Sequence, residues 1–402
     1  MSDVVVALNA GSSSLKFALY RCLSDAPELL ARGQIDGIGA APRFTVRDAV
    51  GGPAQSKELA AEMSEHQLLE VVLEWIENHT AGLTLRAAGH RVVHGGAEFS
   101  RPVWLDGAVL ARLEKLVPLA PLHQPHNLAA IRALAALAPG LPQIACFDTA
   151  FHHHQPALAT IFALPREIRD AGVRRYGFHG LSYDYIAHIL PGHVGDLAAG
   201  RVVVAHLGHG ASMCALSGGK SVATTMGMTA LDGLPMGTRC GALDPGVLLY
   251  LMAEKDMDCA ALTQLLYHRS GLLGLSGLSD DMRELLASDA PESRQAIALF
   301  CYQAARHLGS LAAALGGLDL VVFTGGIGEH AAPVRADICR RARWLGVALD
   351  EAANRQNRLT ISTPDSRVPV LVIPTDENLM IVRHVLDVLD ETAKEKTYGA
   401  NG

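Results

Sequence analysis

The sequence predicts an α/β protein in which one folding pattern occurs twice. A buried strand, a turn of small residues and a second strand follow one another near residue 4 and again near residue 201. Strands and apolar-faced helices alternate after each hairpin, as in α/β domains. The 402 residues suffice for two or three domains. Because the two copies share a pattern and not a sequence, chance recurrence of hairpins in a large α/β protein is the alternative.

The first half opens with a predicted hairpin, in which residues 4–8 and 15–20 are strands joined by the polar turn 9–14. Weaker strand signals surround residues 44–46. Ser64 to Gln67 resembles a capping box and predicts a helix over 68–76. The other elements expected here are strands over 87–92 and 143–147 and helices over about 106–117 and 125–138.

The second half repeats the pattern, and we place the junction near residue 150. Expected strands are 201–207, 213–216, 221–225, 318–323 and 368–373, and expected helices are 293–315, one that opens at Ala332, and about 379–395. A glycine-rich turn is predicted over 324–329. We expect one domain over 1–149 plus 379–402 and another over 150–378.

Composition excludes several classes of protein. The net charge of −7 argues against nucleic acid or an anionic membrane as the main partner. No apolar run approaches the roughly 18 residues of a membrane span, and the first residues lack a basic signal region. The 7 cysteines are scattered and never form Cys-x-x-Cys, which predicts reduced thiols in a cytoplasmic protein.

Three glycine-rich turns, 9–16, 206–212 and 324–329, each follow a predicted strand. Backbone N–H groups in such turns form concave sites for phosphate oxygens. Each turn alone is weak evidence, because hairpins use glycine for geometry. Together they favour a nucleotide bound between two domains. None is a P-loop, and the loose match of Gly326 to Ala331 to a dinucleotide motif leaves an oxidoreductase as a weaker alternative.

Two arginines stand in apolar, glycine-flanked surroundings. Arg91 lies in a strand of Ala, Val and Gly, and Arg239 lies between Gly237 and Gly241. A buried guanidinium is costly unless it is paired, so a structural salt bridge would explain either residue alone. Two such arginines suit a carboxylate and a phosphate as ligands, since guanidinium groups donate two hydrogen bonds to both.

Acidic residues and histidines complete the set of candidates. Asp148 and Glu377 each follow a predicted strand, where two carboxylates could hold Mg²⁺ or could cap the next helix. His179, in a predicted loop, could donate to a phosphoryl group, and His123 is a second candidate. His152 to His154 suggest a metal site, but adjacent residues do not share a face, which favours a solvated turn.

Taken together, the motifs resemble the acetate kinase family of acyl kinases along nearly the whole chain. The matching stretches are Asn9–Phe17, Arg91–Gly96, Phe147–His152, Arg175–Gly180, Thr225–Thr229, Gly237–Gly241 and Phe323–Glu329. The resemblance implies the duplicated actin-like fold of sugar kinases, actin and heat-shock cognate proteins, with two domains around a nucleotide cleft. It also implies reversible in-line phosphoryl transfer from ATP to acetate, giving acetyl phosphate and ADP, and a homodimer.

The resemblance also implies roles for individual residues. Arg91 and Arg239 would bind the carboxylate and the phosphoryl group, His179 would stabilise the transition state, and Asp148 would be the essential acid. Asn9 and Glu377 would support Mg²⁺ or Mn²⁺. The acyl pocket would include Val93, Leu122, His123 and Ala230. The nucleotide site would comprise Lys16, His206, Leu207, Gly208, His209, Gly210, Asp281, Met282, Arg283, Gly326, Ile327, Gly328, Glu329 and His330.

The chain departs from the family pattern at several positions. His209 and His330 each replace an asparagine, Ala230 replaces a proline, and Ala242 replaces an aspartate. The usual Asn-Glu-Glu near the end is Asp376-Glu377-Asn378. Since one methylene changes specificity by only about 1–3 kcal/mol, Ala230 could broaden the acceptor range to propionate or butyrate. An actin-like ATPase or sugar kinase, and a non-catalytic nucleotide- or metal-binding protein, are the alternatives outside the family.

Overall fold

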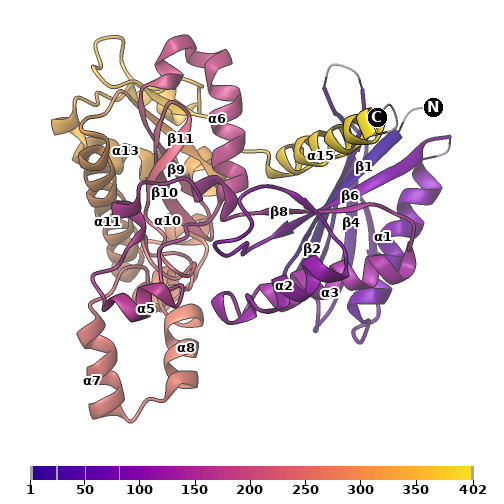
Figure 1. The fold of residues 1–402 in the computed structure, drawn as a ribbon. Coiled ribbons are helices and arrows are strands. Elements are labelled where there is room, and N and C mark those ends of the chain that lie inside the picture. Colours follow the sequence, from indigo (N-terminus) through magenta and orange to yellow (C-terminus); the bar gives the residue numbers. More distant parts are fainter. Residues whose placement is uncertain (1–2, 24–25, 50, 81, 400–402) are drawn as a thin grey trace. The chain divides into compact units, whose positions relative to one another are not determined.

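The computed structural model describes residues 3–23, 26–49, 51–80 and 82–399. The chain divides into two compact units (Figure 1). Unit 1 comprises residues 1–150 and 376–402, and unit 2 comprises residues 151–375. The chain therefore passes between the units twice, at Ala150–Phe151 and at Thr375–Asp376.

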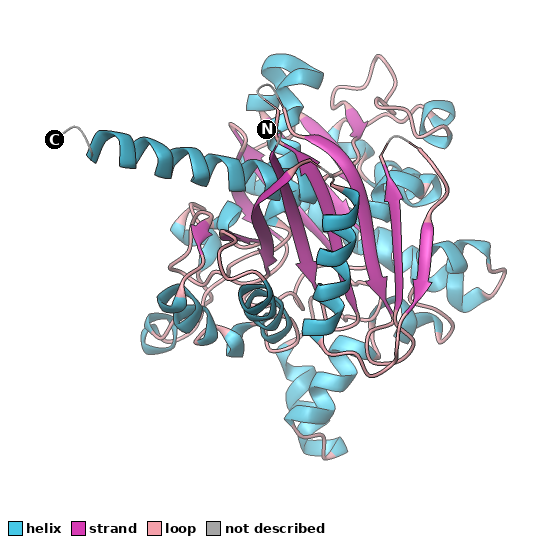
Figure 2. Cartoon of the chain, turned by 90° about the vertical axis from the view of Figure 1, so that its right-hand side faces the viewer, coloured by secondary structure: helices cyan, strands magenta, loops and turns pink. Residues whose placement is uncertain are grey.

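Unit 1 contains an eight-stranded sheet, in which β1 pairs antiparallel with β2 and parallel with β6, and β6 pairs parallel with β8 (Figure 2). The carboxyl ends of β1, β6 and β8 therefore meet at one edge of the sheet. The strand order is β5-β4-β3-β2-β1-β6-β8-β7, with β1 Asp3–Ala10, β2 Ser14–Arg21, β3 Glu28–Asp36, β4 Arg43–Asp48, β5 Gln55–Glu58, β6 Thr84–Val92, β7 Val103–Trp104 and β8 Gln143–Phe147.

Helices cover both faces of this sheet. Helices α1 (Glu65–His79) and α3 (Gln124–Leu137) pack on the face that presents Val4, Val6 and Leu8. Helix α15 (Glu377–Gly399) packs on the opposite face, close enough that a Cβ on Gly89 would lie 2.4 Å from Ile381 Cγ2. The capping box expected at Ser64 is present. Helix α2 (Gly107–Glu114) and the 3₁₀ turn η1 (Val117–Leu119) precede α3.

Unit 2 contains a five-stranded sheet in the order β11-β10-β9-β12-β13. The strands are β9 Arg201–Leu207, β10 Ala211–Ser217, β11 Lys220–Thr224, β12 Leu320–Thr324 and β13 Val370–Val372. Helix α6 (Gly180–Val194) shares a core with β9, β10 and β12, and α11 (Pro291–Leu315) packs against β9, β10 and β11. Helices α12 (Gly325–His330) and α13 (Ala332–Arg341) follow β12.

The remaining helices of unit 2 are short and lie in three stretches of the chain, 150–199, 245–287 and 343–355. They are η2 Ala150–His152, which begins at the unit boundary, α4 Ala157–Thr160, α5 Arg166–Asp170, η3 Gly195–Ala199, α7 Pro245–Lys255, α8 Cys259–His268, α9 Gly271–Ser276, α10 Met282–Ala287, η4 Arg343–Leu345 and α14 Glu351–Arg355. No helix among the described residues combines the length and apolar character that a membrane span requires.

The two sheets confirm the predicted duplication. The run β3-β2-β1-β6-β8 of unit 1 and the run β11-β10-β9-β12-β13 of unit 2 have the same sequence of antiparallel and parallel pairings. In each unit an antiparallel hairpin is followed by two parallel strands. The matching topology, and not only two recurrent hairpins, accounts for the repeated pattern in the sequence.

One predicted turn is wrong. Residues 325–329 of the expected glycine-rich turn 324–329 belong to the helix α12, which begins directly after β12. Gly325 has φ +75°, and a Cβ there would lie 2.8 Å from the carbonyl oxygen of Leu207. Glycine is therefore required at position 325, where the chain turns sharply from β12 into α12. The following glycines belong to the helix itself.

Candidate active site

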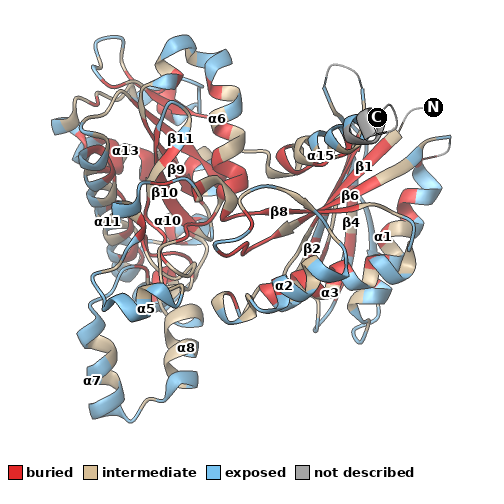
Figure 3. Cartoon of the chain, viewed as in Figure 1, coloured by how far each residue is buried: buried red, intermediate tan, exposed pale blue. Residues whose placement is uncertain are grey.

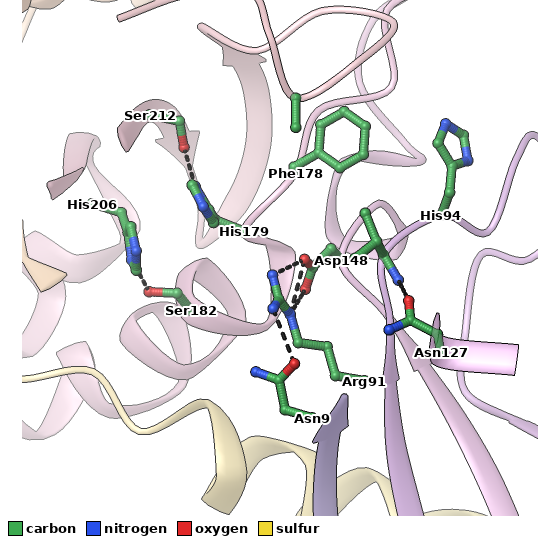
Figure 4. Close-up of polar contacts among 12 residues, drawn as sticks. Asn9, Arg91, His94, Asn127, Asp148, Phe178, His179, Ser182, His206 and Ser212 are labelled. Carbon is green, nitrogen blue, oxygen red and sulfur yellow. Dashed lines mark hydrogen bonds and ion pairs between the residues drawn. The ribbon is translucent and has the colours of Figure 1, made fainter. Parts of the chain in front are cut away.

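The sheet edge of unit 1 brings together three of the predicted residues, Asn9, Arg91 and Asp148 (Figure 4). They stand at the carboxyl ends of β1, β6 and β8. Arg91 Nη2 lies 2.5 Å from Asp148 Oδ2, its Nε lies 3.0 and 3.1 Å from the two carboxylate oxygens, and its Nη1 donates to Asn9 Oδ1 at 3.3 Å. The parallel register places these side chains at the same end of neighbouring strands, because Leu8 pairs with His90 and Val92 pairs with Phe147, so that Asn9, Arg91 and Asp148 lie next to these pairs.

In the Arg91–Asp148 pair the carboxylate is buried and the guanidinium is partly exposed. The Asp148 side chain is 2% exposed and the Arg91 side chain 21%. Burial by itself lowers the pKa of the Arg91 guanidinium, but the charges of Asp148 and Glu377 outweigh it and raise that pKa. For Arg91, the structural salt bridge that the sequence suggested as an alternative explanation is therefore present. It also fixes the plane of the guanidinium, since two nitrogens donate to one carboxylate.

The segment after β6, which includes Val93, is held by two buried amides of α3. The Val93 N–H donates to Asn127 Oδ1 at 3.0 Å, and Asn127 Nδ2 donates to the carbonyl oxygen of Ala10 at 2.6 Å. Gln124 exchanges two hydrogen bonds with the backbone of His94. Leu122 and His123 directly precede α3, with His123 at its N-cap. Sequence reasoning missed Gln124 and Asn127, although two amides in an otherwise apolar helix face are a recognisable signal.

Glu377 is the first residue of α15, and its charge acts on Arg91. Asp376 caps this helix, accepting from the Leu379 N–H at 3.0 Å, and also pairs with Arg32 and the Tyr20 hydroxyl. Burial and then the Asp376 charge raise the pKa of Tyr20 to about 12. The alternative role of a helix cap is thus fulfilled by Asp376. Lys16 is the cross-strand partner of Asn9 in the β1–β2 hairpin and is exposed.

The donor set of unit 1 fits a magnesium ion. The Asn9 amide oxygen and the Glu377 carboxylate are hard oxygen ligands next to Arg91, and Mg²⁺ is commonly bound by one or two protein oxygens with the remainder supplied by phosphate and water. Among the described residues, no cluster of three or more His, Cys, Asp or Glu side chains is arranged to hold a metal by itself. Asn9 and Glu377 are therefore the residues that would hold such an ion, with a nucleotide supplying the other oxygens.

In unit 2, His179 and Arg239 meet at Gly210. A Cβ on Gly210 would lie 3.2 Å from His179 Nε2 and 3.9 Å from Arg239 Nη1. His179 Nδ1 lies 2.8 Å from the hydroxyl of buried Ser212, and its ring stacks on His206 with centroids 4.4 Å apart (Figure 4). A side chain at position 210 would therefore crowd the His179 imidazole and contact the Arg239 guanidinium.

His179 is held in an unusual backbone conformation. It occupies the N-cap of α6 with φ +58°, a left-handed conformation that is rare for residues other than glycine. Such conformations persist where the surroundings impose them, often at functional sites. The predicted loop around His179 is present, and the 15-residue helix α6 begins directly after it at Gly180. The helix and Ser212 together fix the direction of the imidazole.

Arg239 lies on the turn 236–241, and the backbone of this turn packs closely against Gly271. Arg239 Nη1 donates to the Ala230 carbonyl at 3.0 Å and lies 3.5 Å from Met236 Sδ. Gly271 has φ +60°, and a Cβ there would lie 2.1 Å from the Met236 carbonyl oxygen and 2.7 Å from that of Arg239. Ala230 contacts Arg239 through its carbonyl group, which a proline at this position would also provide.

A cavity of about 400 Å³ in unit 2 collects eight of the residues expected at the nucleotide site. These are Gly208, His209, Asp281, Met282, Arg283, Gly326, Ile327 and His330, joined by Asp280, Leu286 and Ala331, which the sequence did not indicate. Apolar side chains and a rim of charges make this cavity suitable for a flat heterocycle that carries a polar group. His209 Nε2 lies 2.9 Å from Asp280 Oδ2 at the rim.

The other residues expected at the nucleotide site do not line this cavity. Leu207 is buried in the core, and the His206 ring lies 2.8 Å from the Ser182 hydroxyl. Glu329 accepts from the backbone N–H groups of Gly325 and Thr375 and so braces the start of α12. Gly328 is buried inside that helix, and Gly210 lies beside His179 and Arg239.

The solvated turn predicted for the histidine triplet is wrong for His152. Its side chain is buried, with Nδ1 2.8 Å from the Ser221 hydroxyl and Nε2 2.9 Å from the Phe178 carbonyl oxygen. Burial lowers the pKa of His152 to about 4. His152, kept neutral by burial, therefore anchors the backbone of Phe178, the residue that precedes His179. His154 is exposed, as expected for a turn.

Comparison with known proteins supplies the family context. Residues 4–383 match the model of the acetokinase family. The chain is 58% identical to an acetate kinase of Rhodopseudomonas palustris over 97% of this chain and 99% of that one, and 52% identical to an acetate kinase of Methylocella silvestris over 98% and 100%.

Solved structures agree with the sequence matches. The crystal structure of an acetate kinase from Porphyromonas gingivalis has a TM-score of 0.87 and 36% identity, covering 96% of this chain and all of that one. The crystal structure of a propionate kinase from Francisella tularensis has a TM-score of 0.89 and 35% identity, covering 95% and 98%.

Proposed function

The chain belongs to the acetokinase family, and we propose that it catalyses reversible transfer of the γ-phosphoryl group of ATP to acetate, giving acetyl phosphate and ADP. It is thus a kinase with a carboxylate acceptor. The observation that carries the proposal is the Arg91–Asp148 pair at the strand ends of a chain whose family match runs over nearly its full length. A guanidinium fixed in this way suits a carboxylate or phosphoryl ligand.

The acceptor needs no general base, because acetate is already a carboxylate near neutral pH. One of its oxygens attacks the γ-phosphorus in line, forming an O–P bond while the bond to the bridging β,γ-oxygen breaks and ADP leaves with that electron pair. We assign Arg91 to the acceptor carboxylate and to the phosphoryl group. Asp148 then acts by fixing the Arg91 guanidinium and not by moving a proton.

Negative charge spreads over the three equatorial oxygens of the transferring group, and catalysis depends on positioning and on stabilising that charge. Arg239 and His179 have the arrangement for this task, since both face Gly210. With Nδ1 engaged by Ser212, Nε2 is the His179 nitrogen that we assign to a phosphoryl oxygen. Loss of one such donor typically lowers kcat by about 10² to 10³.

Asn9 and Glu377 would hold Mg²⁺ or Mn²⁺. We assign Lys16 to the nucleotide phosphates. A bound divalent ion would neutralise charge on the β- and γ-phosphate oxygens. The cavity of unit 2 would take the adenosine, with Ile327, Leu286 and Met282 against the base. Val93, Leu122, His123 and Ala230 would enclose the acyl methyl group.

Two further properties belong to the proposal. Seven free cysteines suit a reducing compartment, which supports a cytoplasmic location. We also propose a homodimer, in keeping with the preference of soluble proteins for two-fold assemblies. The partners are then acetate or acetyl phosphate, the adenine nucleotide and a second copy of the chain.

An acceptor series tests the proposed activity. The protein is incubated with ATP, Mg²⁺ and hydroxylamine, which traps an acyl phosphate as its hydroxamate, and kcat/KM is measured for acetate, propionate and butyrate. We expect acetate to exceed propionate by about tenfold, the value of one methylene in a fitted pocket. Preference for propionate or butyrate would favour the related kinases, and ADP formation that no carboxylate stimulates would favour an ATPase or sugar kinase.

A further inference from the structure

The turn between β9 and β10 carries His209, the histidine that replaces an asparagine of the family pattern. Both strands are buried along almost their whole length, as the red in Figure 3 shows, whereas the His209 side chain is 60% exposed. The turn is tight, because the Gly208 N–H donates to the Gly210 carbonyl at 3.1 Å. A fixed turn therefore presents an imidazole at the rim of the unit 2 cavity.

Two contacts orient the His209 ring. Its Nε2 lies 2.9 Å from Asp280 Oδ2. A Cβ on Gly237 would lie 2.5 Å from both Cδ2 and Nε2 of the ring, so this edge packs on the turn that carries Arg239. The Gly237 N–H also donates to the His209 carbonyl at 3.0 Å. Nδ1 is the ring atom opposite to the packed edge, and it is the nitrogen that can serve a ligand.

The place of His209 in the fold puts it next to the phosphates of a bound nucleotide, and this step rests on the proposed function. Gly208 and His209 line the cavity that we assign to the adenosine. The next residue, Gly210, lies beside His179 and Arg239, which we assign to the transferring phosphoryl group. A nucleotide that occupies both places runs past these three consecutive residues. Its phosphate oxygens therefore pass the His209 ring.

The protonated form of this imidazole is the one that satisfies a carboxylate and a phosphate together. An ionised carboxylate accepts hydrogen bonds and donates none, so Asp280 requires a hydrogen on Nε2 of His209. In the neutral ring Nδ1 is then an acceptor, and it opposes a phosphate oxygen, which is also an acceptor. In the imidazolium both nitrogens donate, and the positive charge lies between two anions.

We propose that nucleotide binding draws a proton onto His209, so that the affinity of this site for ADP and ATP falls as the pH rises. Histidine is the side chain that ordinarily changes charge between about pH 5 and 8. A ligand that prefers one protonation state of its site binds with an affinity that depends on pH. An asparagine donates from its amide nitrogen at any pH. The histidine at position 209 thus makes a nucleotide site of this family sensitive to protons.

The other charged groups near His209 have partners or roles of their own. Asp281 and Arg283, at the start of α10, form an ion pair with each other. Hydrogen bonds from Arg283 lower the pKa of Asp281, and the charge of His209 adds to this effect. Arg239 and His179 belong to the phosphoryl site. Asp280 is therefore the carboxylate that sets the hydrogen-bonding state of the His209 ring.

Isothermal titration calorimetry with ADP and Mg²⁺, in buffers of different ionisation enthalpy, counts the protons taken up on binding without any turnover. The comparison is between wild type and His209→Asn, since protons that come from ADP itself cancel in the difference. At pH 7 we expect the wild type to take up about half a proton more than the variant. Between pH 6 and 8 the Kd of the wild type for ADP should rise at least about fivefold more than that of the variant. Circular dichroism verifies that both proteins are folded.

Two further variants assign the proton to the pair of His209 and Asp280. In Asp280→Asn the partner can donate as well as accept, so the neutral ring can turn its N–H toward the phosphate. We expect the additional proton uptake to disappear and ADP to bind more tightly than to wild type at pH 8. His330→Asn is the matched control, because His330 lines the same cavity but lies 3.9 Å from Glu329 Oε2, beyond hydrogen-bond distance. This variant should keep the proton uptake of the wild type.

The outcomes separate this inference from the proposed function. Equal proton uptake by wild type and His209→Asn, or loss of the uptake in His330→Asn, would overturn the role of His209. ADP binding without that difference would leave the proposed function intact. Absence of ADP binding at every pH would refute the nucleotide site itself, and the inference with it.

Discussion

Arg91 pairs with a buried carboxylate, so its removal affects folding as well as the reaction. Arg91 compensates the charge of Asp148, which is 2% exposed, so Arg91→Ala would leave a buried carboxylate without its cation at a cost of about 3–5 kcal/mol. Arg239 donates to a backbone carbonyl and faces a thioether sulfur. Loss of activity in an Arg239 variant is therefore interpreted together with the circular dichroism of that variant, which reports its folding.

Two buried histidines make stability depend on pH in a defined window. Burial lowers the pKa of His90 and of His152 to about 4, from an ordinary 6.5. Between those values the unfolded chain binds protons that the folded protein excludes. The free energy of unfolding therefore falls as pH drops from about 6.5 toward 4, by up to about 1.4 kcal/mol per pH unit for each histidine, and this contribution is constant above pH 6.5.

Urea unfolding of wild type and His90→Gln from pH 7.5 to 4.5 isolates one of these contributions, because carboxylates that titrate in the same range are common to both proteins. We expect the stability gap between them to be constant above pH 7 and to shift in favour of the variant by about 1.4 kcal/mol per unit between pH 6 and 5. A gap that does not vary with pH would show that His90 does not stay neutral in the fold. The Gln143 amide, 2.8 Å from His90 Nε2, remains as a partner for the new side chain.

Residues whose surroundings come from distant segments were the hardest to predict. Arg91 was recognisable as a paired arginine, because its flanks are apolar, but only the fold identifies Asp148 as its partner. His152 resembled part of a solvated histidine run, yet Ser221 and Phe178 enclose it from later in the chain. Asn127 was recognisable as an amide in an apolar helix face, but its partners, the backbone groups of Val93 and Ala10, come from earlier in the chain.

Strands and helices whose apolar residues recur with a clear period were predicted well. Short helices that are marked mainly by a capping residue were not. The β1–β2 hairpin, α1 with its capping box and the long α11 follow from alternation or helical spacing. The series α7 to α10 was not assigned, because its helices are short and no face is buried in the first two. Three of these helices nevertheless begin at an aspartate cap, Asp244, Asp258 and Asp281, which is a readable signal.

Gly271 provides a test of the turn that carries Arg239. Gly271→Ala places a Cβ 2.1 Å from the Met236 carbonyl oxygen, so the turn must move, and we expect kcat to fall at least tenfold. Gly277 is the matched control, since it has φ +64° but no atom within 4 Å of its Cβ position. Gly277→Ala should lose roughly 1–2 kcal/mol of stability from the left-handed conformation and keep its kcat. Steady-state kinetics gives kcat and thermal unfolding gives the stability of both variants. Equal kcat values for Gly271→Ala and Gly277→Ala would refute the proposal that Gly271 constrains the turn that carries Arg239.

The duplicated sheet explains why the candidate residues fall into two sets. In each unit a hairpin is followed by two parallel strands, and the carboxyl ends of those strands carry Asn9, Arg91 and Asp148 in unit 1 and the start of α12 in unit 2. The sequence was sufficient to predict this repeat and the family, because strand-turn-strand patterns and long motifs are local. It was not sufficient for α7 and α8, which have no buried residue.

The most direct test follows ATP, ADP and acyl phosphate together by ³¹P NMR, with ATP, Mg²⁺ and acetate, for wild type and Arg239→Ala. For the wild type we predict one acetyl phosphate for each ADP formed, and no ADP when acetate is omitted. For Arg239→Ala we predict a rate at least about 100-fold lower in a protein that remains folded by circular dichroism. ADP without acyl phosphate in the wild type, or wild-type turnover in Arg239→Ala, would contradict carboxylate phosphorylation at this site.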